Sequence, residues 1–257
     1  MQKETVLKVH QLTVNYDKIS VLWDISFSVL KGELVGVIGP NGAGKSTLLS
    51  AILGITKPLS GKILFFDAPF EKVKRRLAYV PQRRSIDWDF PITVFDAVLM
   101  GRYSHLHWIK WYRKRDREKA TETLKILGLE HLAKRQISQL SGGQQQRLFV
   151  ARALMQEADF YILDEPFAGV DMGTEKLIMD ILKKLKEEGK TLLIVHHDLN
   201  TVESYFDSLL ILNTSLIAYG AVKDVFNKEN LLQAFGQKGT LFVEALKLSH
   251  EKSKGFS

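Results

Sequence analysis

The chain has 257 residues, 45% of them hydrophobic, which is enough for one compact protein with a substantial core rather than several domains. It contains no Cys, so disulfides and thiolate metal sites are excluded, and no apolar run approaches the roughly 18 to 20 residues that span a bilayer. The net charge of +7 favours an anionic partner, for which a nucleotide, acidic lipid headgroups and nucleic acid all qualify.

The N-terminal part of the chain predicts β-strands. Residues 8–29 alternate between polar and apolar types and are rich in Val, Leu, Ile and Phe, which favours antiparallel strands at the flank of a core. Residues 34–38 form a short apolar run that is typical of a buried strand. This second run leads directly into the first chemical motif.

A glycine-rich segment follows and matches the whole phosphate-binding P-loop pattern. Its residues are Gly39, Pro40, Asn41, Gly42, Ala43, Gly44, Lys45 and Ser46, with Thr47 at the start of a predicted helix. The glycines let backbone N–H groups turn inward around an anion, at a helix N-terminus whose partial positive charge favours phosphate. We expect Lys45 to contact the β- and γ-phosphates of ATP and Ser46 to bind Mg²⁺.

Residues from about 86 to 150 are predicted to form an inserted helical subdomain. Residues 116–127 place apolar side chains on one helical face, and Gly128 provides a C-terminal stop. Near the start of the insert, Trp88 and Phe90 stand among charged residues. The two rings are interpreted either as anchors for a partner protein or as side chains that close the core of the insert.

The segment from Ser141 through Gly142 and Gly143 to Gln144 predicts a second helix start. Ser141 and Gln144 have the spacing of a capping box, so a helix should run from here to about Met155. Its N-terminus is a second phosphate-binding end. Because one ATP does not need two such ends from the same chain, we infer that this end serves an ATP bound to another subunit. An ordinary capped helix would explain Ser141 and Gln144 but not the paired glycines.

An apolar run at residues 158–163 ends in two carboxylates, Asp164 and Glu165. The run predicts a buried parallel strand with its catalytic end exposed, stopped by Pro166. Asp164 is expected to hold the Mg²⁺ shell together with Ser46, and Glu165 is expected to act as the general base for the attacking water. An acidic pair after a strand is often only a solvated strand end, but its order after a P-loop favours the functional interpretation.

The remaining part of the chain predicts one more helix and strand of the same core. Residues 175–188 have an amphipathic helical pattern stopped by Gly189, and residues 191–195 form a strand that should end at the sheet edge carrying Glu165. After about residue 236 the chain becomes rich in Lys. We therefore expect a single domain over residues 1–236 and a C-terminal tail over residues 237–257.

In this order the P-loop, the Ser141 helix end and the acidic pair resemble the nucleotide-binding subunits of the ATP-binding-cassette (ABC) family, over about residues 5–235. The resemblance implies an α/β fold with a P-loop NTPase (RecA-like) core, a flanking antiparallel β subdomain and an inserted α-helical subdomain. It also implies a role for four further residues. Tyr16 would stack on adenine, Gln82 would touch the metal and the water, Asp171 would lie in a loop that crosses a dimer interface, and His197 would contact the γ-phosphate. His196 directly precedes His197, so the last assignment depends on the Asp198 that follows.

Residues 81–102 closely resemble the branch of this family that powers import of manganese, zinc or iron, in which the same tract contacts the membrane subunit. Two alternatives remain at this point: an importer for another substrate such as iron chelates, and a soluble cassette protein that acts on ribosomes or DNA. The chain has one cassette and no long coiled-coil insertion, which favours the importer, and no nucleic-acid partner is expected.

The family resemblance also implies an assembly. Two copies of the chain would enclose two ATP molecules, bind integral membrane permease subunits, and depend indirectly on an extracytoplasmic metal-binding protein. The N-terminus lacks the apolar stretch of a signal peptide. We therefore expect a peripheral protein at the cytoplasmic face of the cell membrane.

Overall fold

The structure is a computed structural model that describes residues 4–16, 19–105 and 111–237. The chain forms two compact units, one made of Met1–Phe70 with Val195–Ser257 and the other of Glu71–Ile194. The predicted tail at residues 237–257 lies outside the described residues except for its first residue. No helix in the described part of the chain is both long enough and apolar enough to cross a membrane.

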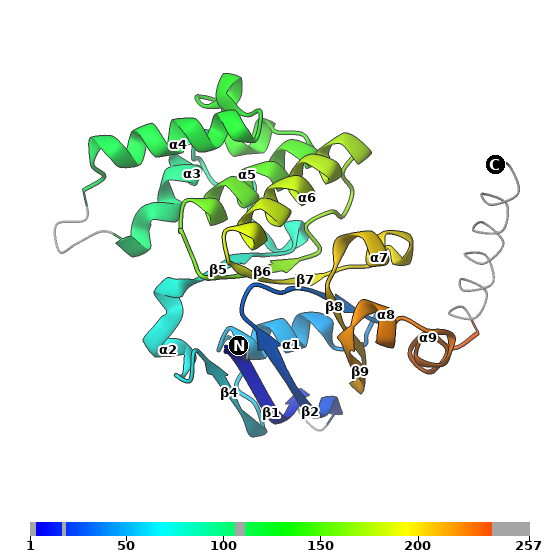
Figure 1. Ribbon diagram of the computed structural model, residues 1–257. Helices are drawn as coiled ribbons and strands as arrows, with labels where there is room; N and C mark the ends of the chain where they lie inside the picture. Colours follow the sequence, from blue (N-terminus) through cyan, green and yellow to red (C-terminus); the bar gives the residue numbers. More distant parts are fainter. Residues whose placement is uncertain (1–3, 17–18, 106–110, 238–257) are drawn as a thin grey trace, which may run out of the picture. The chain divides into compact units, whose positions relative to one another are not determined.

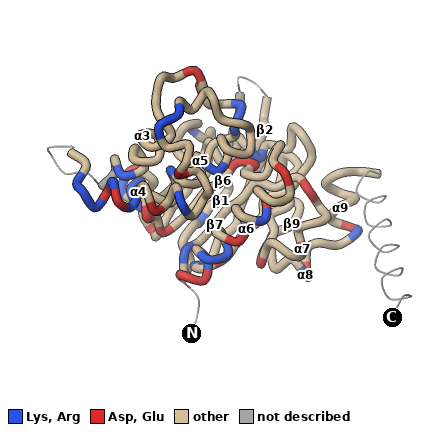
Figure 2. Tube along the Cα trace, turned by 90° about the horizontal axis from the view of Figure 1, so that it is seen from above, with Lys and Arg blue, Asp and Glu red and all other residues tan. Residues whose placement is uncertain are grey.

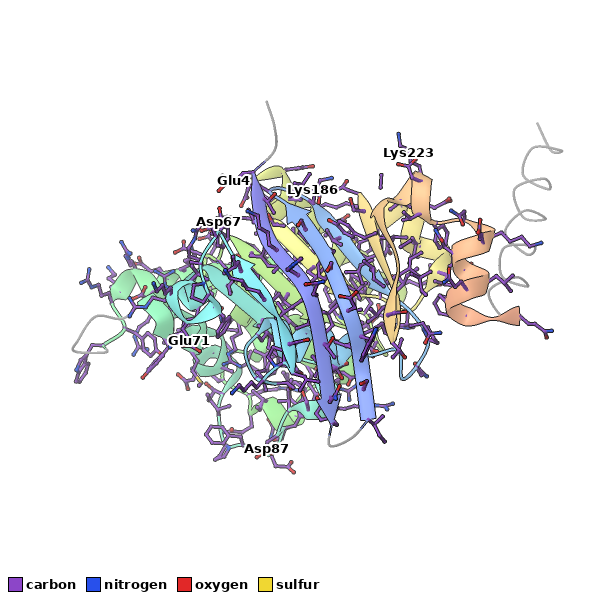
Figure 3. The ribbon with its side chains drawn as sticks, turned by 90° about the horizontal axis from the view of Figure 1, so that it is seen from below. Glu4, Asp67, Glu71, Asp87, Lys186 and Lys223 are labelled. Atoms are coloured by element: carbon purple, nitrogen blue, oxygen red, sulfur yellow. The ribbon has the colours of Figure 1, made fainter. Side chains whose placement is uncertain are left out.

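The first unit contains two groups of strands. β1 (Thr5–Tyr16) pairs antiparallel with β2 (Ile19–Leu30) on one side and with β4 (Ser60–Phe65) on the other. Lys8 and Asp67 form an ion pair at one end of this sheet, where Asp67 and Glu4 are labelled in Figure 3. The antiparallel strands predicted for residues 8–29 are therefore confirmed.

The second group of strands in this unit carries the P-loop. β3 (Leu34–Ile38) runs parallel to β8 (Ser208–Asn213), and β8 pairs antiparallel with β9 (Ser215–Ala221). All five residues of β3 are buried, which is typical of a strand in a parallel sheet with both faces covered. The helices of the unit are α1 (Lys45–Ile52), α7 (Val202–Tyr205), α8 (Val222–Val225) and α9 (Lys228–Phe235).

The strands of the second unit are β5 (Leu77–Val80), β6 (Phe160–Asp164) and β7 (Thr191–Val195). They are neighbours in that order, and β5 is parallel to β6. Every residue of β6 and β7 is buried. The apolar runs at residues 158–163 and 191–195 are therefore correctly predicted as buried strands.

Among the residues that the structure describes, five helices belong wholly or mostly to the second unit, and α3, α4 and α5 lie together in Figure 1. They are α2 (Phe70–Val73), α3 (Val94–Leu99), α4 (Lys114–Ile126), α5 (Gly142–Leu154) and α6 (Met172–Glu187). Short 3-10 turns occur at Lys74–Arg76, Arg83–Ser85, Met100–His105, Glu130–Leu132 and Ile137–Gln139, and in the first unit at Leu199–Thr201.

The helices α4 and α6 begin two or three residues before the predicted starts. α4 begins at Lys114, because Asp116 accepts a hydrogen bond from the backbone N–H of Arg113 at 2.9 Å and so caps the helix start rather than beginning it. α6 begins at Met172, capped by Asp171. Both helices end as predicted, before Gly128 and Gly189, which have positive φ angles of 63° and 80°. Figure 2 shows basic and acidic residues interspersed along α4, and Lys114 pairs with Glu118 there.

Candidate nucleotide-binding and hydrolysis site

The P-loop connects β3 to α1 and has the backbone geometry of an anion cradle. Gly42 and Gly44 have φ angles of 81° and 91°, which other residues adopt only with strain. A Cβ at Gly39 would lie 2.1 Å from the carbonyl oxygen of Leu212, so a close backbone approach requires glycine there. These positions explain why the loop needs its glycines, and the resulting cradle fits a phosphate chain.

The side chain of Lys45 is held by backbone carbonyl groups of the P-loop. Its ammonium Nζ donates to the carbonyl oxygens of Gly39 at 2.8 Å and Pro40 at 2.9 Å, and the side chain is buried. Ser46, at the second position of α1, is exposed. A cation fixed at the mouth of the cradle and an exposed hydroxyl beside it are the groups that β- and γ-phosphates with Mg²⁺ require.

Tyr16 ends β1 in the same unit. Its ring is 49% exposed, and its hydroxyl lies 3.5 Å from Oγ1 of Thr56. An aromatic side chain with this exposure is compatible with stacking on a base.

The two adjacent histidines after β7 have different surroundings. His196 is buried, its backbone N–H donates to the carbonyl of Val37 at 3.0 Å, and its Nε2 lies 2.7 Å from Oγ1 of Thr201. The rings of Tyr205 and Phe206 flank it at 5.9 and 5.3 Å. His197 is exposed. Of these two histidines, His197 is the one exposed to a ligand, which supports its assignment over His196.

Burial lowers the pKa of His196 to about 4, and the nearby ring of His197 contributes in the same direction. The unfolded chain binds this proton with an ordinary pKa near 6.5, so the free energy of unfolding should fall as the pH drops from about 6.5 towards 4. We expect the melting temperature to fall across this range in the wild-type protein and to fall less in His196→Gln. His197→Gln is the matched control, which should keep most of the wild-type pH dependence, because burial is the larger cause of the lowered pKa. Equal slopes for His196→Gln and the wild type would contradict the assignment.

Asp164 and Glu165 end strand β6 in the second unit. Asp164 is only 4% exposed, and Glu165 is half-buried. The expectation of an exposed strand end is therefore wrong for Asp164, because the chain turns back at Glu165 and buries Pro166 and Phe167 behind it. Burial, together with the charge of Asp164, raises the pKa of Tyr79 to about 12. A buried carboxylate of this kind is a suitable ligand for a divalent cation.

Glu165 has a strained backbone and a defined partner. Its φ angle is 51°, in the left-handed region that non-glycine residues rarely adopt. Nε2 of Gln82 donates to Oε2 of Glu165 at 2.8 Å. The structure thus brings together two of the predicted catalytic residues, and a strained backbone at such a position is typical of functional sites.

The helix start at Ser141 has the predicted capping box. The Ser141 N–H donates to Oε1 of Gln144 at 2.9 Å, and the Gln144 N–H donates to Oγ of Ser141 at 3.4 Å. Asp171 lies beside this helix end, since a Cβ at Gly143 would be 3.6 Å from its Oδ2. Asp171 also accepts hydrogen bonds from the backbone N–H and the Oγ1 hydroxyl of Thr174, and in this way it caps the start of α6. Two helix N-termini therefore lie next to each other in this unit.

An apolar groove of about 200 Å³ lies in the second unit. It is lined by Ile86, Asp87, Phe90, Ile92, Ala97, Met100, Ile137, Leu148, Phe149 and Arg152. Phe90 is 55% exposed, and the side chain of Asp87 projects from the surface (Figure 3). The guanidinium of Arg152 lies 5.7 Å from the centre of the Phe149 ring.

Trp88 and Phe90, predicted as a pair, differ in the structure. Trp88 is half-buried, packs edge-on against Phe149 at 5.3 Å between ring centres, and donates from Nε1 to the carbonyl of Arg83 at 3.0 Å. Phe90 instead lines the open groove. The packing interpretation therefore fits Trp88, and the docking interpretation fits Phe90.

The hydrogen bond between Arg83 and Gln145 was not predicted from the sequence. Nε of Arg83 donates to Oε1 of Gln145 at 2.7 Å, although the two residues are 62 positions apart. Arg83 lies in the tract of residues 81–102 and Gln145 in the helix predicted from Ser141 to about Met155, but no sequence pattern relates one residue to the other. The only sequence signal is a glutamine on the buried face of a predicted helix.

Known proteins resemble this chain over most of its length. The protein-family model described as ABC transporter matches residues 22–168. The zinc transport system ATP-binding protein TroB of Treponema pallidum is 52% identical over 238 residues, covering 92% of this chain and 90% of that protein. The manganese transport system ATP-binding protein MntB of Bacillus subtilis is also 52% identical over 238 residues, covering 93% of this chain and 95% of that protein.

Solved structures show the same fold. An ATP-binding cassette of an ABC transporter, in its ADP conformation, has a TM-score of 0.75 and 30% identity, covering 90% of this chain and 98% of that chain. The ATP-binding subunit of another ABC transporter has a TM-score of 0.78 and 27% identity, covering 93% and 99%. The predicted α/β fold with a parallel core and an antiparallel β subdomain is confirmed by this similarity.

Proposed function

The chain belongs to the ABC transporter family, and we propose that it is the ATP-hydrolysing subunit of an importer for manganese or zinc. The observation that carries this proposal is the 52% identity, over more than nine tenths of the chain, to one protein named for zinc transport and one named for manganese transport. Since the two identities are equal, similarity does not choose between the two ions. The subunit acts as a peripheral protein at the cytoplasmic face of the membrane.

The proposed chemistry is hydrolysis of the γ-phosphate of ATP. Lys45 supplies a fixed positive charge to the β- and γ-phosphates, and the P-loop N–H groups bind the phosphate chain, in line with the cradle described above. Ser46 and Asp164 would hold Mg²⁺, which, when bound, neutralises part of the charge that develops on the phosphate oxygens. Glu165 accepts a proton from the attacking water as general base.

Three further residues complete the proposed site. Gln82 orients the Glu165 carboxylate, a role that the 2.8 Å hydrogen bond between their side chains supports. His197 contacts the γ-phosphate, and Tyr16 stacks on the adenine, roles that the exposure of both rings supports. These assignments come from the family motifs, and the contacts of each residue are compatible with them.

Two copies of the chain would act together, each closing the ATP of the other. The helix end formed by Ser141, Gly142, Gly143 and Gln144 presents backbone N–H groups and a partial positive charge, and Asp171 lies beside it. An end of this kind fits the γ-phosphate of a nucleotide bound to the second copy. Because ATP has higher affinity for the closed pair, binding closes the dimer and hydrolysis reopens it.

The apolar groove is proposed to receive a segment of the permease. Phe90 and Met100 are the exposed apolar members of its lining, at 55% and 45% exposure. Exposed apolar side chains around a concave surface are typical of interface anchors. An extracytoplasmic metal-binding protein would act only indirectly, through the permease.

Metal uptake by cells tests both the proposed transport function and the proposed docking of the permease in the apolar groove. Cells that depend on the wild-type chain should take up manganese or zinc, and Phe90→Ala should abolish that uptake while keeping the wild-type melting temperature and the ATPase rate of the isolated subunit. The matched variant Trp88→Ala should instead lower the free energy of unfolding by about 1 to 3 kcal/mol, less than the roughly 3 to 5 kcal/mol of a fully buried ring.

Two outcomes would contradict these proposals. Normal uptake by Phe90→Ala would refute the groove as a docking surface. Wild-type cells with no ATP-dependent uptake of either ion, together with co-purification of the chain with RNA or DNA, would replace the importer by a nucleic-acid function.

A further inference from the structure

The residue that follows Gln82 reaches a different part of the second unit. Nε of Arg83 donates to Oε1 of Gln145 on α5, and Gln145 is only 6% exposed. A Cβ at Gly142 would lie 2.5 Å from Nη1, 3.0 Å from Cζ and 3.4 Å from Nη2 of Arg83. The guanidinium therefore lies against the first turn of α5, in space that glycine leaves open.

A second contact joins the same segment to α5 one turn further along. Trp88 packs against Phe149 at 5.3 Å, and its Nε1 donates to the carbonyl of Arg83. Gln145 and Phe149 are four residues apart and so lie on one face of the helix. Residues 83–88 are thus tied to α5 at two neighbouring points, the first beside Gly142 and the second beside the apolar groove.

Helix stability does not explain the position of Arg83. A cation beside a helix N-terminus is opposed by the helix dipole. Among the residues that the structure describes, no carboxylate forms an ion pair with Arg83, and the only side chain hydrogen-bonded to its guanidinium is that of Gln145. The contact thus holds a charged group at a place where α5 by itself does not favour one.

Two consecutive side chains therefore connect two parts of the proposed site. Gln82 contacts the carboxylate of Glu165 at 2.8 Å, and Arg83 contacts Gln145 at 2.7 Å. Because Gln82 and Arg83 are joined by one peptide unit, the N-terminal turn of α5 and the carboxylate of Glu165 are linked through two hydrogen bonds and this short stretch of chain.

We propose that Arg83 is a positioning residue for ATP hydrolysis, which holds the Ser141 end of α5 in a fixed place relative to Gln82 and Glu165. The inference rests on the proposed function, in which that helix end closes over the ATP of a second copy. Arg83 itself touches no reacting atom in this scheme. It acts through its hydrogen bond to Gln145. This bond couples the position of the Ser141 helix end to the orientation of Glu165, which Gln82 contacts.

A double-mutant cycle with kinetics and binding tests this role. Arg83→Ala and Gln145→Ala should each lower kcat by about tenfold, and the double variant should be no worse than either single variant, because coupled residues are not additive. The Kd for ATP should stay within about twofold of wild type, since the P-loop is unchanged. Arg83→Lys should recover part of the rate, because an ammonium group can still donate to Gln145. Arg75→Ala, at an exposed arginine of the same unit, is the control and should behave as wild type.

Three results would overturn the inference. They are a kcat for Arg83→Ala within about twofold of wild type, losses that multiply in the double variant, and a fall in melting temperature that accounts for the lost rate. If Arg83→Ala fails to fold, Gln145→Ala and Arg83→Lys decide the question by the same kcat and Kd values. A wild-type protein that hydrolyses ATP keeps the proposed function intact whichever result Arg83 gives.

Discussion

Glu165→Gln should bind ATP as the wild-type protein does and lose turnover by a factor of about 10² to 10⁴, the range expected when a general base is removed. The amide has nearly the same shape as the carboxylate and can still accept the hydrogen bond from Gln82, so the fold should be kept. It cannot take a proton from water. The effect should therefore appear in kcat, with the Kd for ATP unchanged.

Lys45→Ala is the matched comparison, because it removes the positive charge that is proposed to bind the phosphates of ATP and leaves the proposed general base, Glu165, in place. The buried ammonium over the carbonyls of Gly39 and Pro40 is then absent, and ATP binding should weaken. Measuring Kd and single-turnover hydrolysis on both variants separates the two roles. Tight ATP binding with normal hydrolysis in both would refute the assignments.

Ser141→Arg should abolish the ATP-dependent dimer. In the Glu165→Gln background with ATP and Mg²⁺, hydrolysis stalls, so the protein should elute from a sizing column as a dimer, whereas without nucleotide it should elute as a monomer. Arginine at position 141 removes the Oγ that accepts from the Gln144 N–H. It also places bulk and a cation at the helix end that we propose closes over the γ-phosphate of the second copy.

Ser141→Ala separates the two effects of that change. It removes the cap, at a cost of about 0.5 to 2 kcal/mol of helix stability, but adds neither bulk nor charge. We expect Ser141→Ala to weaken the dimer and Ser141→Arg to eliminate it. A dimer that persists in Ser141→Arg, or that forms equally well without nucleotide, would indicate a different interface.

The features predicted correctly from the sequence depend on contacts between residues close together in the chain. The capping box joins Ser141 to Gln144, and the stops at Gly128 and Gly189 follow from the φ angles that only glycine adopts easily. The P-loop is likewise recognised as one continuous glycine pattern, and the positive φ angles of Gly42 and Gly44 belong to that segment itself. Such features can be read without knowing the rest of the fold, because both partners of each interaction lie in one short stretch.

Other features were decided by the tertiary structure. Gln82 and Glu165 are 83 positions apart, and Arg83 and Gln145 are 62 positions apart, so neither hydrogen bond could be inferred from spacing. Trp88 and Phe90 have similar surroundings in the sequence, yet Trp88 packs edge-on against the ring of Phe149 and Phe90 lines the open groove. Asp164 is buried because the chain folds back after it.

The sequence alone therefore predicted the elements of the proposed chemistry: a phosphate cradle, a cation for ATP, an acidic pair and a capped glycine-rich helix end. The tertiary structure decided which of these residues meet within each unit, which ring is free to bind a partner, and that Arg83 connects Gln82 to α5. The physical reason is that the motifs are specified by local backbone geometry, whereas side-chain partners and burial depend on packing between segments far apart in the chain.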